Sequence, residues 1–312
     1  MKRWMPLKGN FVLEDEEIVF QGLSQQTSGN PIIHDLLISQ AVPDGIVLYE
    51  DVISNGTIEA VIEFEKFEKG DLAQIIFNYG NDSYYMCAGV ANTSAKYGFN
   101  LMNGQLNTIY ATGFIEELPI SRFDLNLQLF GSFLGLSVNG VQVFTYPIPG
   151  IVYPGQVGIW VKSKNKIRIH DFKTTSKEPE VFIVSQFGTD YDILYDEVIR
   201  PVCKKLKYNP VRGDEVVSCS MILSDIITSI RNSTVIIADI TPDNPNVFYE
   251  IGYAHALNKP TILLCERKIR DKLPFDISGF RTNFYDNSIG GKRKVEEKLE
   301  QYLQTIGNMS GV

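Results

Sequence analysis

Residues 235–264 constrain the fold more than any other stretch, because they join two apolar runs through a strongly marked helix start. Residues 235–237 are β-branched and apolar without polar alternation, which is typical of a strand buried on both faces of a parallel sheet. Asp243-Asn244-Pro245 then supplies a helix cap followed by proline at the first helical position. The stretch therefore predicts a strand, loop, helix and strand, with Glu250 as an acid among aromatic and apolar neighbours on the helix.

The rest of the C-terminal half continues this alternation. Residues 181–184 have the pattern of a buried strand. Apolar residues at helical spacing follow over residues 194–206, and Pro201 is expected to kink this helix. Further elements are expected as a short extended segment near 209–214, a helix over 221–231 and a charged helix over about 292–306. Strands alternating with helices predict a doubly wound α/β domain with a parallel sheet.

A parallel sheet of this kind predicts where its ligand binds. Ligands lie outside the carboxyl ends of the strands. Those ends are expected at residues 185–190, near Arg212 and at residues 239–246. Three distant segments are thereby predicted to converge on one crevice.

The N-terminal half has a period of two. Residues 57–65 alternate, with Ile58, Ala60 and Ile62 pointing one way, and Asn139-Gly140 between two alternating runs is a strong signal for a hairpin with a type I′ turn. Further strands are expected over residues 73–79, 83–90, 157–161 and 167–172. Many short strands without helices predict an all-β sandwich.

The period changes after a polar segment at residues 173–180 that contains a proline. We therefore predict two domains, residues 1–176 and residues 177–312. A chain of 312 residues is long enough for each to have its own core.

Composition excludes several classes of function. With 37 acidic and 29 basic residues the net charge is -8, which argues against a general binder of nucleic acids or of anionic membranes. No apolar run approaches the length of a membrane span, so a cytoplasmic location is expected. The four cysteines and three histidines show no metal-ligand spacing, and we expect neither a metal site nor disulfides.

The N-terminal half resembles concanavalin-like (laminin-G-like) jelly rolls, through LSVNGV at residues 136–141 and GQVGIW at residues 155–160. The resemblance implies a sensing or scaffolding module with a carbohydrate or protein ligand. Aromatic side chains that could stack on a sugar are Tyr84, Tyr85, Tyr97 and Trp160. Aromatic residues in strands are more often part of the core, so that alternative stays open.

The C-terminal half resembles the TIR-like and nucleoside 2-deoxyribosyltransferase-like proteins. The resemblance is carried by VFIVSQF at residues 181–187, by Tyr195 and Pro201, and by Arg212-Gly213-Asp214. It is carried above all by ADIT at residues 238–241 together with NPNVFYEIGYAHA at residues 244–256. It implies a flavodoxin-like or TIR-like fold that cleaves the N-glycosidic bond of a nucleotide, with Glu250 at the position of the glutamate that contacts the sugar. For TIR-like members it further implies hydrolysis or cyclisation of NAD as substrate, a role in bacterial antiphage defence, and homo-oligomers.

The predicted crevice offers further substrate contacts. Ser185, Gln186 and Asp190 can bond ribose or phosphate, and Arg212 can pair with a phosphate. The remaining candidates are Phe187 and Tyr249 as stacking partners of a base, Asn244 and Asn246 at the helix N-terminus, and Asp239 at the strand end.

Structural roles compete with these assignments. Asp239 could instead bond loop amides, Arg212 could form a structural ion pair with Asp214, and Asn244 caps a helix in any case. His255 follows Glu250 by five residues, about 140° around a helix, which disfavours a role as its general base. Glu250 could itself be a structural carboxylate.

Three functions follow in order of preference. The first is cleavage of NAD, in which a carboxylate stabilises the oxocarbenium character that develops on the ribose. Nicotinamide leaves without a general acid, because its ring nitrogen already carries positive charge. The alternatives are a nucleoside deoxyribosyltransferase or hydrolase, and a non-enzymatic receptor for a nucleotide signal.

Overall fold

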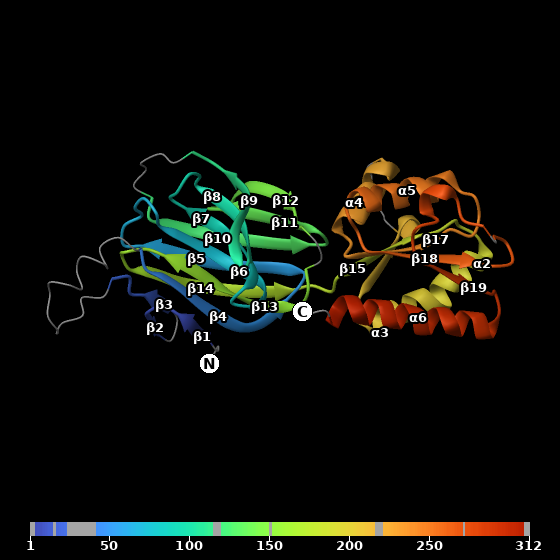
Figure 1. Ribbon diagram of the computed structural model, residues 1–312, viewed down its shortest axis with the longest axis horizontal. Coiled ribbons are helices and arrows are strands. Elements are labelled where there is room, and N and C mark those ends of the chain that lie inside the picture. The colour runs from blue at the N-terminus through green and yellow to red at the C-terminus, as the bar shows by residue number, and fades with distance from the viewer. Residues whose placement is uncertain are drawn as a thin grey trace.

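The computed structural model describes residues 4–14, 17–23, 42–114, 120–149, 152–215, 221–270 and 272–308. A β-sandwich forms one end of an elongated molecule and a smaller α/β unit forms the other end (Figure 1). Both are built on strands whose apolar side chains are removed from water.

Two antiparallel sheets form the sandwich. The first contains, in spatial order, β1 (Trp4–Lys8), β4 (Asp44–Ile53), β13 (Gly155–Lys162), β6 (Leu72–Asn81), β7 (Tyr84–Ala91), β8 (Tyr97–Asn103) and β9 (Gln105–Thr112). The second contains β12 (Val141–Pro147), β11 (Phe133–Val138), β10 (Arg122–Phe130), β5 (Gly56–Phe64), β14 (Ile167–Ser176), β3 (Glu17–Phe20) and β2 (Phe11–Leu13). The expected jelly-roll sandwich is confirmed.

Local sequence signals account for much of this architecture. In β5, Ile58, Ala60 and Ile62 all point into the core between the sheets, as their alternation predicts. The β11–β12 turn has positive φ at Asn139 (51°) and at Gly140 (76°), the conformation that the Asn-Gly pair favours. The side-chain oxygen of Asn139 also accepts a hydrogen bond from the N–H of Asp124 at 2.8 Å, which ties the turn to β10.

The α/β unit contains a five-stranded parallel sheet. Its spatial order is β16 (Asn209–Arg212), β15 (Glu180–Val184), β17 (Val235–Asp239), β18 (Thr261–Glu266) and β19 (Thr282–Tyr285). The helices are α2 (Thr189–Leu194), α3 (Arg200–Lys205), α4 (Ile222–Asn232), α5 (Pro245–Ala256) and α6 (Ile289–Asn308). α4 and α5 cover one face of the sheet, and α3 and α6 cover the other (Figure 1).

The first helical segment differs from the single kinked helix that we expected. A π-helical turn, η1 (Tyr195–Ile199), lies between α2 and α3, and the N–H of Arg200 donates to the carbonyl of Tyr195, five residues back. Pro201 follows in the first turn of α3 and has no N–H to donate to the carbonyl of Glu197. The ladder of hydrogen bonds is therefore interrupted by the wider turn just before the proline.

The sandwich meets the α/β unit at the amino ends of the parallel strands. β14 ends at Ser176 and β15 begins at Glu180, so the connection is short. The side chain of Asn55, in the β4–β5 turn, donates to the carbonyl of Glu178, and the N–H of Lys177 donates to the carbonyl of Asn55. These contacts fasten the connecting segment to the sandwich.

Among the helices in the described ranges, none has the length and apolar character needed to cross a bilayer.

Candidate functional site

Helix α5 carries the acid that the sequence singles out. The helix begins at Pro245, and the side-chain oxygen of Asn244 accepts a hydrogen bond from the N–H of Asn246 at 3.0 Å. Val247 and Ile251 face the sheet and are buried. Glu250 stands beside this apolar stripe and is half-buried.

The carboxylate of Glu250 is electrostatically isolated. Burial raises its pKa from 4.5 to about 7. Within the described part of the chain, no hydrogen bond or ion pair engages it. A carboxyl group whose pKa is raised toward neutrality is suited to acid–base or nucleophilic chemistry.

The opposite edge of α5 is fastened to the connection between β18 and β19. Arg270 lies 5.7 Å from the ring of Phe248, and His255 stacks on Phe280 with ring centroids 4.1 Å apart. Burial lowers the pKa of His255. Because His255 lies on this edge, it is turned away from Glu250, as the five-residue spacing predicts.

The segment after β15 supplies four of the predicted contacts. Ser185 follows the last residue of the strand, and its hydroxyl oxygen is buried without a hydrogen-bond partner among the described residues. Gln186 is half-buried and Asp190 is exposed. Phe187 presents an open ring, with 58% of the residue exposed.

Arg212 is held in a network of its own. Its Nε and Nη2 donate to the two carboxylate oxygens of Asp214 at 2.7 and 2.6 Å, and Nη1 donates to Asp192 at 2.8 Å. The guanidinium also lies 4.7 Å from the ring of Tyr195 and 5.5 Å from that of Phe187. Two carboxylates thus hold the pKa of Arg212 above its usual value. Three of its five N–H groups are engaged by these carboxylates, so the structural ion pair with Asp214 is the arrangement observed.

Asp239 is also committed to internal contacts. It is 2% exposed, and one carboxylate oxygen accepts from the N–H of Thr241 at 2.8 Å and from its hydroxyl. The other oxygen accepts from the hydroxyl of Tyr285 at 2.7 Å. Burial raises the pKa of Asp239, and these hydrogen bonds oppose the effect. The side chain therefore holds the loop after β17 in place, which is the structural alternative that the sequence left open for it.

The predicted site residues divide between the two faces of the sheet. Ile237 packs in the cluster that contains α6, so Asp239, two residues further along β17, faces that side. Glu250 and Tyr249 belong to α5 on the other face, and 52% of Tyr249 is exposed. Asn246 is exposed at the start of the helix. The loops that follow β15 and β17 lie next to each other, because the two strands pair from Val181↔Val235 to Val184↔Ala238.

Several partners were not recognised from the sequence. Asp192 and Tyr285 carry no local signal, since each acquires its role only through a contact that the fold creates. Tyr195 and Thr241 belong to segments that carry the family resemblance, but their contacts with Arg212 and Asp239 also arise only in the fold. No group of three or more His, Cys, Asp or Glu side chains in the described ranges is arranged to hold a metal ion.

The aromatic candidates of the sandwich are mostly packed. Tyr85 (2% exposed) and Trp160 (7% exposed) belong to an apolar cluster on the outer face of the first sheet, with Leu48 and Ile76 among its members. Their rings are not free to stack on a sugar. Tyr84 and Tyr97 are half-buried.

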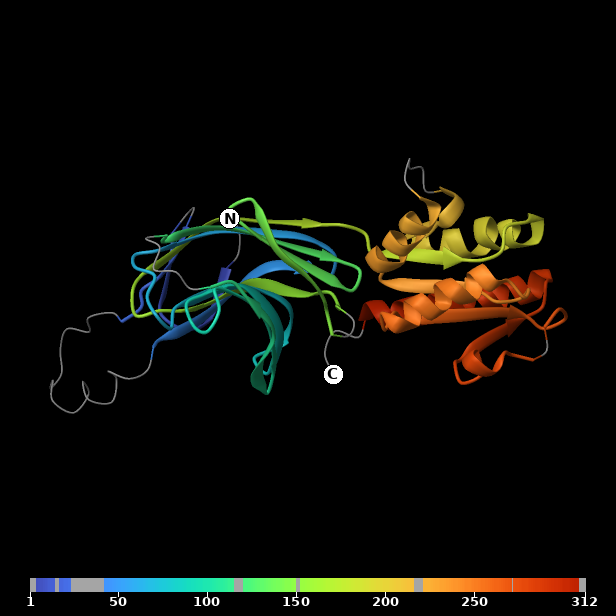
Figure 2. The same ribbon diagram turned by 90° about the horizontal axis from the view of Figure 1, so that it is seen from above.

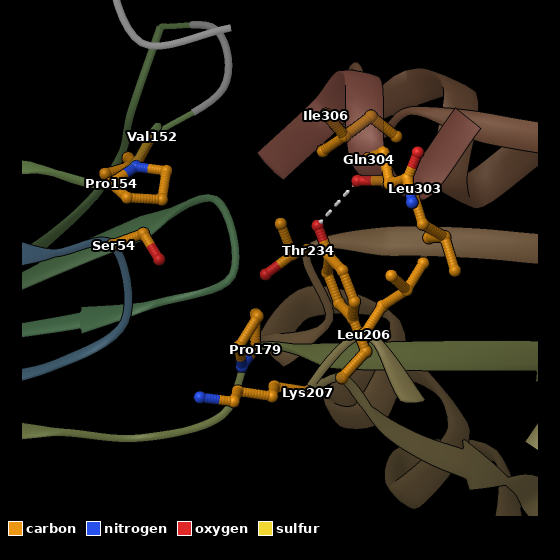
Figure 3. A pocket seen from close by; sticks show the side chains of 11 residues that line it. Ser54, Val152, Pro154, Pro179, Leu206, Lys207, Thr234, Leu303, Gln304 and Ile306 are labelled. Atoms are coloured by element: carbon orange, nitrogen blue, oxygen red, sulfur yellow. Dashed lines mark hydrogen bonds between the residues drawn. The ribbon is translucent and has the colours of Figure 1, made fainter. Parts of the chain in front are cut away.

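A hollow lies between the two parts of the molecule (Figure 3). Its volume is about 290 Å³, and its walls come from Ser54, Val152, Pro154, Pro179, Leu206, Lys207, Tyr208, Thr234, Leu303, Gln304 and Ile306. Pro179 and Thr234 precede β15 and β17, so this hollow is at the amino ends of the strands. It is therefore separate from the crevice that the sequence predicts at the carboxyl ends.

Comparison with known proteins finds solved structures that are similar to about half of the chain, at low identity. No protein-family model matches the chain, and no curated protein matches it. A carbohydrate-binding module from Bacillus subtilis is similar at 16% identity, over 55% of this chain and 95% of that one, with a TM-score of 0.41. A Bacillus subtilis protein of unknown function with a galectin-like fold is 11% identical, over 56% and 90%, with a TM-score of 0.37. A prokaryotic β-1,3-1,4-glucanase (lichenase) from a mouse hindgut metagenome is 12% identical, over 55% and 92%, with a TM-score of 0.38.

Proposed function

We propose that the α/β unit is a flavodoxin-like domain of the TIR-like and deoxyribosyltransferase-like type, and that it cleaves the N-glycosidic bond of a nucleotide, with NAD as the leading substrate. Strand order supports the fold proposal. Numbered along the unit, the order β16-β15-β17-β18-β19 is 2-1-3-4-5, the order of flavodoxin, whose ligand binds where the order reverses. That point lies between β15 and β17.

The observation that carries the proposal is the unpaired carboxylate of Glu250. A buried acid without a partner is costly to the folded state, and such groups cluster at functional sites. Its place in the first half of α5, which starts at the carboxyl end of β17, puts it beside the proposed crevice.

The reaction requires little from the protein besides this carboxylate. In NAD hydrolysis the bond between C1′ and the nicotinamide nitrogen breaks, and its electron pair neutralises the positive ring. Ionised Glu250 stabilises the resulting oxocarbenium-like ribose. Water then adds to C1′ and releases a proton to the solvent. In cyclisation, a nucleophilic nitrogen of the same nucleotide replaces the water.

The neighbouring side chains supply recognition in this proposal. The exposed rings of Phe187 and Tyr249 stack on bases, and the unpartnered hydroxyl of Ser185 bonds a ribose hydroxyl or a phosphate oxygen. The N-terminus of α5 favours the negative pyrophosphate.

The decisive experiment is incubation of the full chain with NAD, with release of nicotinamide followed by chromatography. Glu250→Gln keeps the shape but removes the charge, and its rate should fall at least about a hundredfold. Glu296→Gln, at an exposed position on α6, is the matched control and should keep the rate of the unmodified protein. An unchanged rate in Glu250→Gln would refute the assignment.

A second candidate function is favoured by the same pKa. A neutral purine or pyrimidine base, unlike nicotinamide, leaves more readily when it receives a proton. A carboxyl group with a pKa of about 7 is a competent donor near neutral pH. Turnover of deoxynucleosides without loss of NAD would select nucleobase exchange or hydrolysis over NAD cleavage.

A further inference from the structure

The turn between β10 and β11 is where the sandwich reaches the helices of the α/β unit. Gly131 has a φ of 57° in this turn, and a Cβ atom there would lie 2.4 Å from the carbonyl oxygen of Asn232. Asn232 is the last residue of α4. Only glycine allows so close an approach, so the turn is seated directly on the end of that helix.

Phe133 contacts the ends of two helices at once. The Arg231 guanidinium, in the last turn of α4, lies 4.7 Å from the centre of the Phe133 ring. The ammonium of Lys259, three residues beyond the end of α5, lies 5.8 Å from the same ring. Both distances are within the range of cation–π attraction. One aromatic ring of the sandwich therefore contacts two basic side chains, one in the last turn of α4 and one just beyond α5.

Lys259 links these two helix ends to each other. Its ammonium donates to the carbonyl oxygens of Arg231 and Ser233 at 2.7 and 2.5 Å, and its own N–H donates to the carbonyl of Ala254 in α5 at 2.9 Å. The residue is 4% exposed. It satisfies carbonyl groups that the end of α4 leaves without helical partners. Burial, and then the like charge of Arg231, lower the pKa of Lys259 to about 7. The hydrogen bonds to the two carbonyl groups and the contact with the Phe133 ring favour the protonated form of Lys259.

The junction of Phe133, Arg231 and Lys259 connects to Glu250 through a single helix. Glu250 lies in the middle of α5, and Lys259 bonds to the same helix through Ala254, four positions further along, which is a helical rise of about 6 Å. A helix of this length moves as a rigid body, so a displacement at its C-terminal end moves Glu250 as well.

We propose that Phe133 and Lys259 are positioning residues through which the sandwich sets the place of α5, and so of the Glu250 carboxylate, in the crevice. An event on the sandwich that shifts the β10–β11 turn then changes the surroundings of Glu250. The link to catalysis rests on the proposed function, whereas the mechanical coupling does not.

Amide hydrogen exchange tests the coupling directly. Phe133→Leu keeps an apolar side chain but removes the ring face, and we expect amides of α5 to exchange about tenfold faster while those of β17 keep their rates. Phe133→Tyr should restore the original exchange, because it restores the ring. Phe114→Leu, at an exposed phenylalanine of the sandwich, is the matched control and should change nothing in α5.

Lys259→Met gives a second route to the same result, with Lys294→Met at an exposed position of α6 as its control. In Phe133→Leu and Lys259→Met, the NMR-detected pKa of Glu250 should fall from about 7 toward 4.5, because a loosened α5 admits water. Unchanged exchange and an unchanged Glu250 pKa in both variants overturn the proposal, as does a Phe133→Tyr variant that behaves like Phe133→Leu. If both readouts shift but the unmodified protein does not cleave NAD, the coupling stands and the proposed reaction fails.

Discussion

Replacing Glu250 with glutamine should stabilise the protein, and the gain should depend on pH. The folded-state pKa of this carboxyl group is raised from 4.5 to about 7. The folded state therefore holds the proton more tightly than the unfolded state does. Stability is highest below pH 4.5, falls as the pH rises to about 7, and then stays reduced.

The size of the effect follows from the shift. At about 1.4 kcal/mol per pKa unit, the raised pKa of Glu250 corresponds to about 3 kcal/mol of lost stability. Since the carboxyl group keeps some contact with solvent, we reduce this to about 2 kcal/mol. Glutamine has a similar shape and no charge, so Glu250→Gln should be about 2 kcal/mol more stable than the unmodified protein at pH 8 and only about 0.8 kcal/mol more stable at pH 5.

Urea denaturation at both pH values, followed by circular dichroism of the helices, measures this difference. Other titrating groups, Lys259 included, are common to both proteins and cancel. Glu296→Gln should show no gain at either pH. If Glu250→Gln is no more stable than the unmodified protein at pH 8, or gains equally at both pH values, the carboxylate is not isolated as we describe.

Four further predictions concern the same unit. Arg212→Met leaves two carboxylates unpaired and should cost about 2 kcal/mol of stability in urea denaturation. Tyr285→Phe removes a hydrogen bond to buried Asp239 and should cost about 1–2 kcal/mol by the same measurement. Asn244→Ala removes the cap of α5 and should cost about 1 kcal/mol, visible as a lower Tm. If ionised Glu250 is the reactive form, kcat for NAD cleavage should rise with pH from 6 to 8, with an apparent pKa near 7, and a flat profile would contradict that role.

The fold was predictable where its signals are local. The alternation of Ile58, Ala60 and Ile62 and the Asn139-Gly140 turn each lie within a few residues, and the structure has the strand and hairpin that they predict. The π-helical turn before Pro201 was not predictable. A proline without an N–H predicts a break in the helical hydrogen bonds, but it does not predict that the break is a π-helical turn.

The site was less accessible to sequence reasoning, because side chains acquire partners only when the chain folds. The sequence is equally compatible with Arg212 as a phosphate ligand and with Arg212 as a member of a structural ion pair. The difference depends on Asp192, which belongs to another element, α2. Asp239 likewise depends on Tyr285, two strands away in the sheet. Glu250 could be singled out because its apolar neighbours are adjacent in sequence and dictate its burial.

The attachment of the sandwich at the amino ends of the parallel strands also determines what can approach the molecule. The proposed crevice is at the opposite edge of the sheet, and the two parts lie end to end along the long axis (Figure 2). The N-terminal part can therefore be anchored to a surface, or joined to a bulky neighbour, without blocking diffusion of a small molecule to Glu250. Immobilisation through the sandwich should leave the accessibility of that carboxylate unchanged, whereas a bulky label placed at Phe187 should obstruct it.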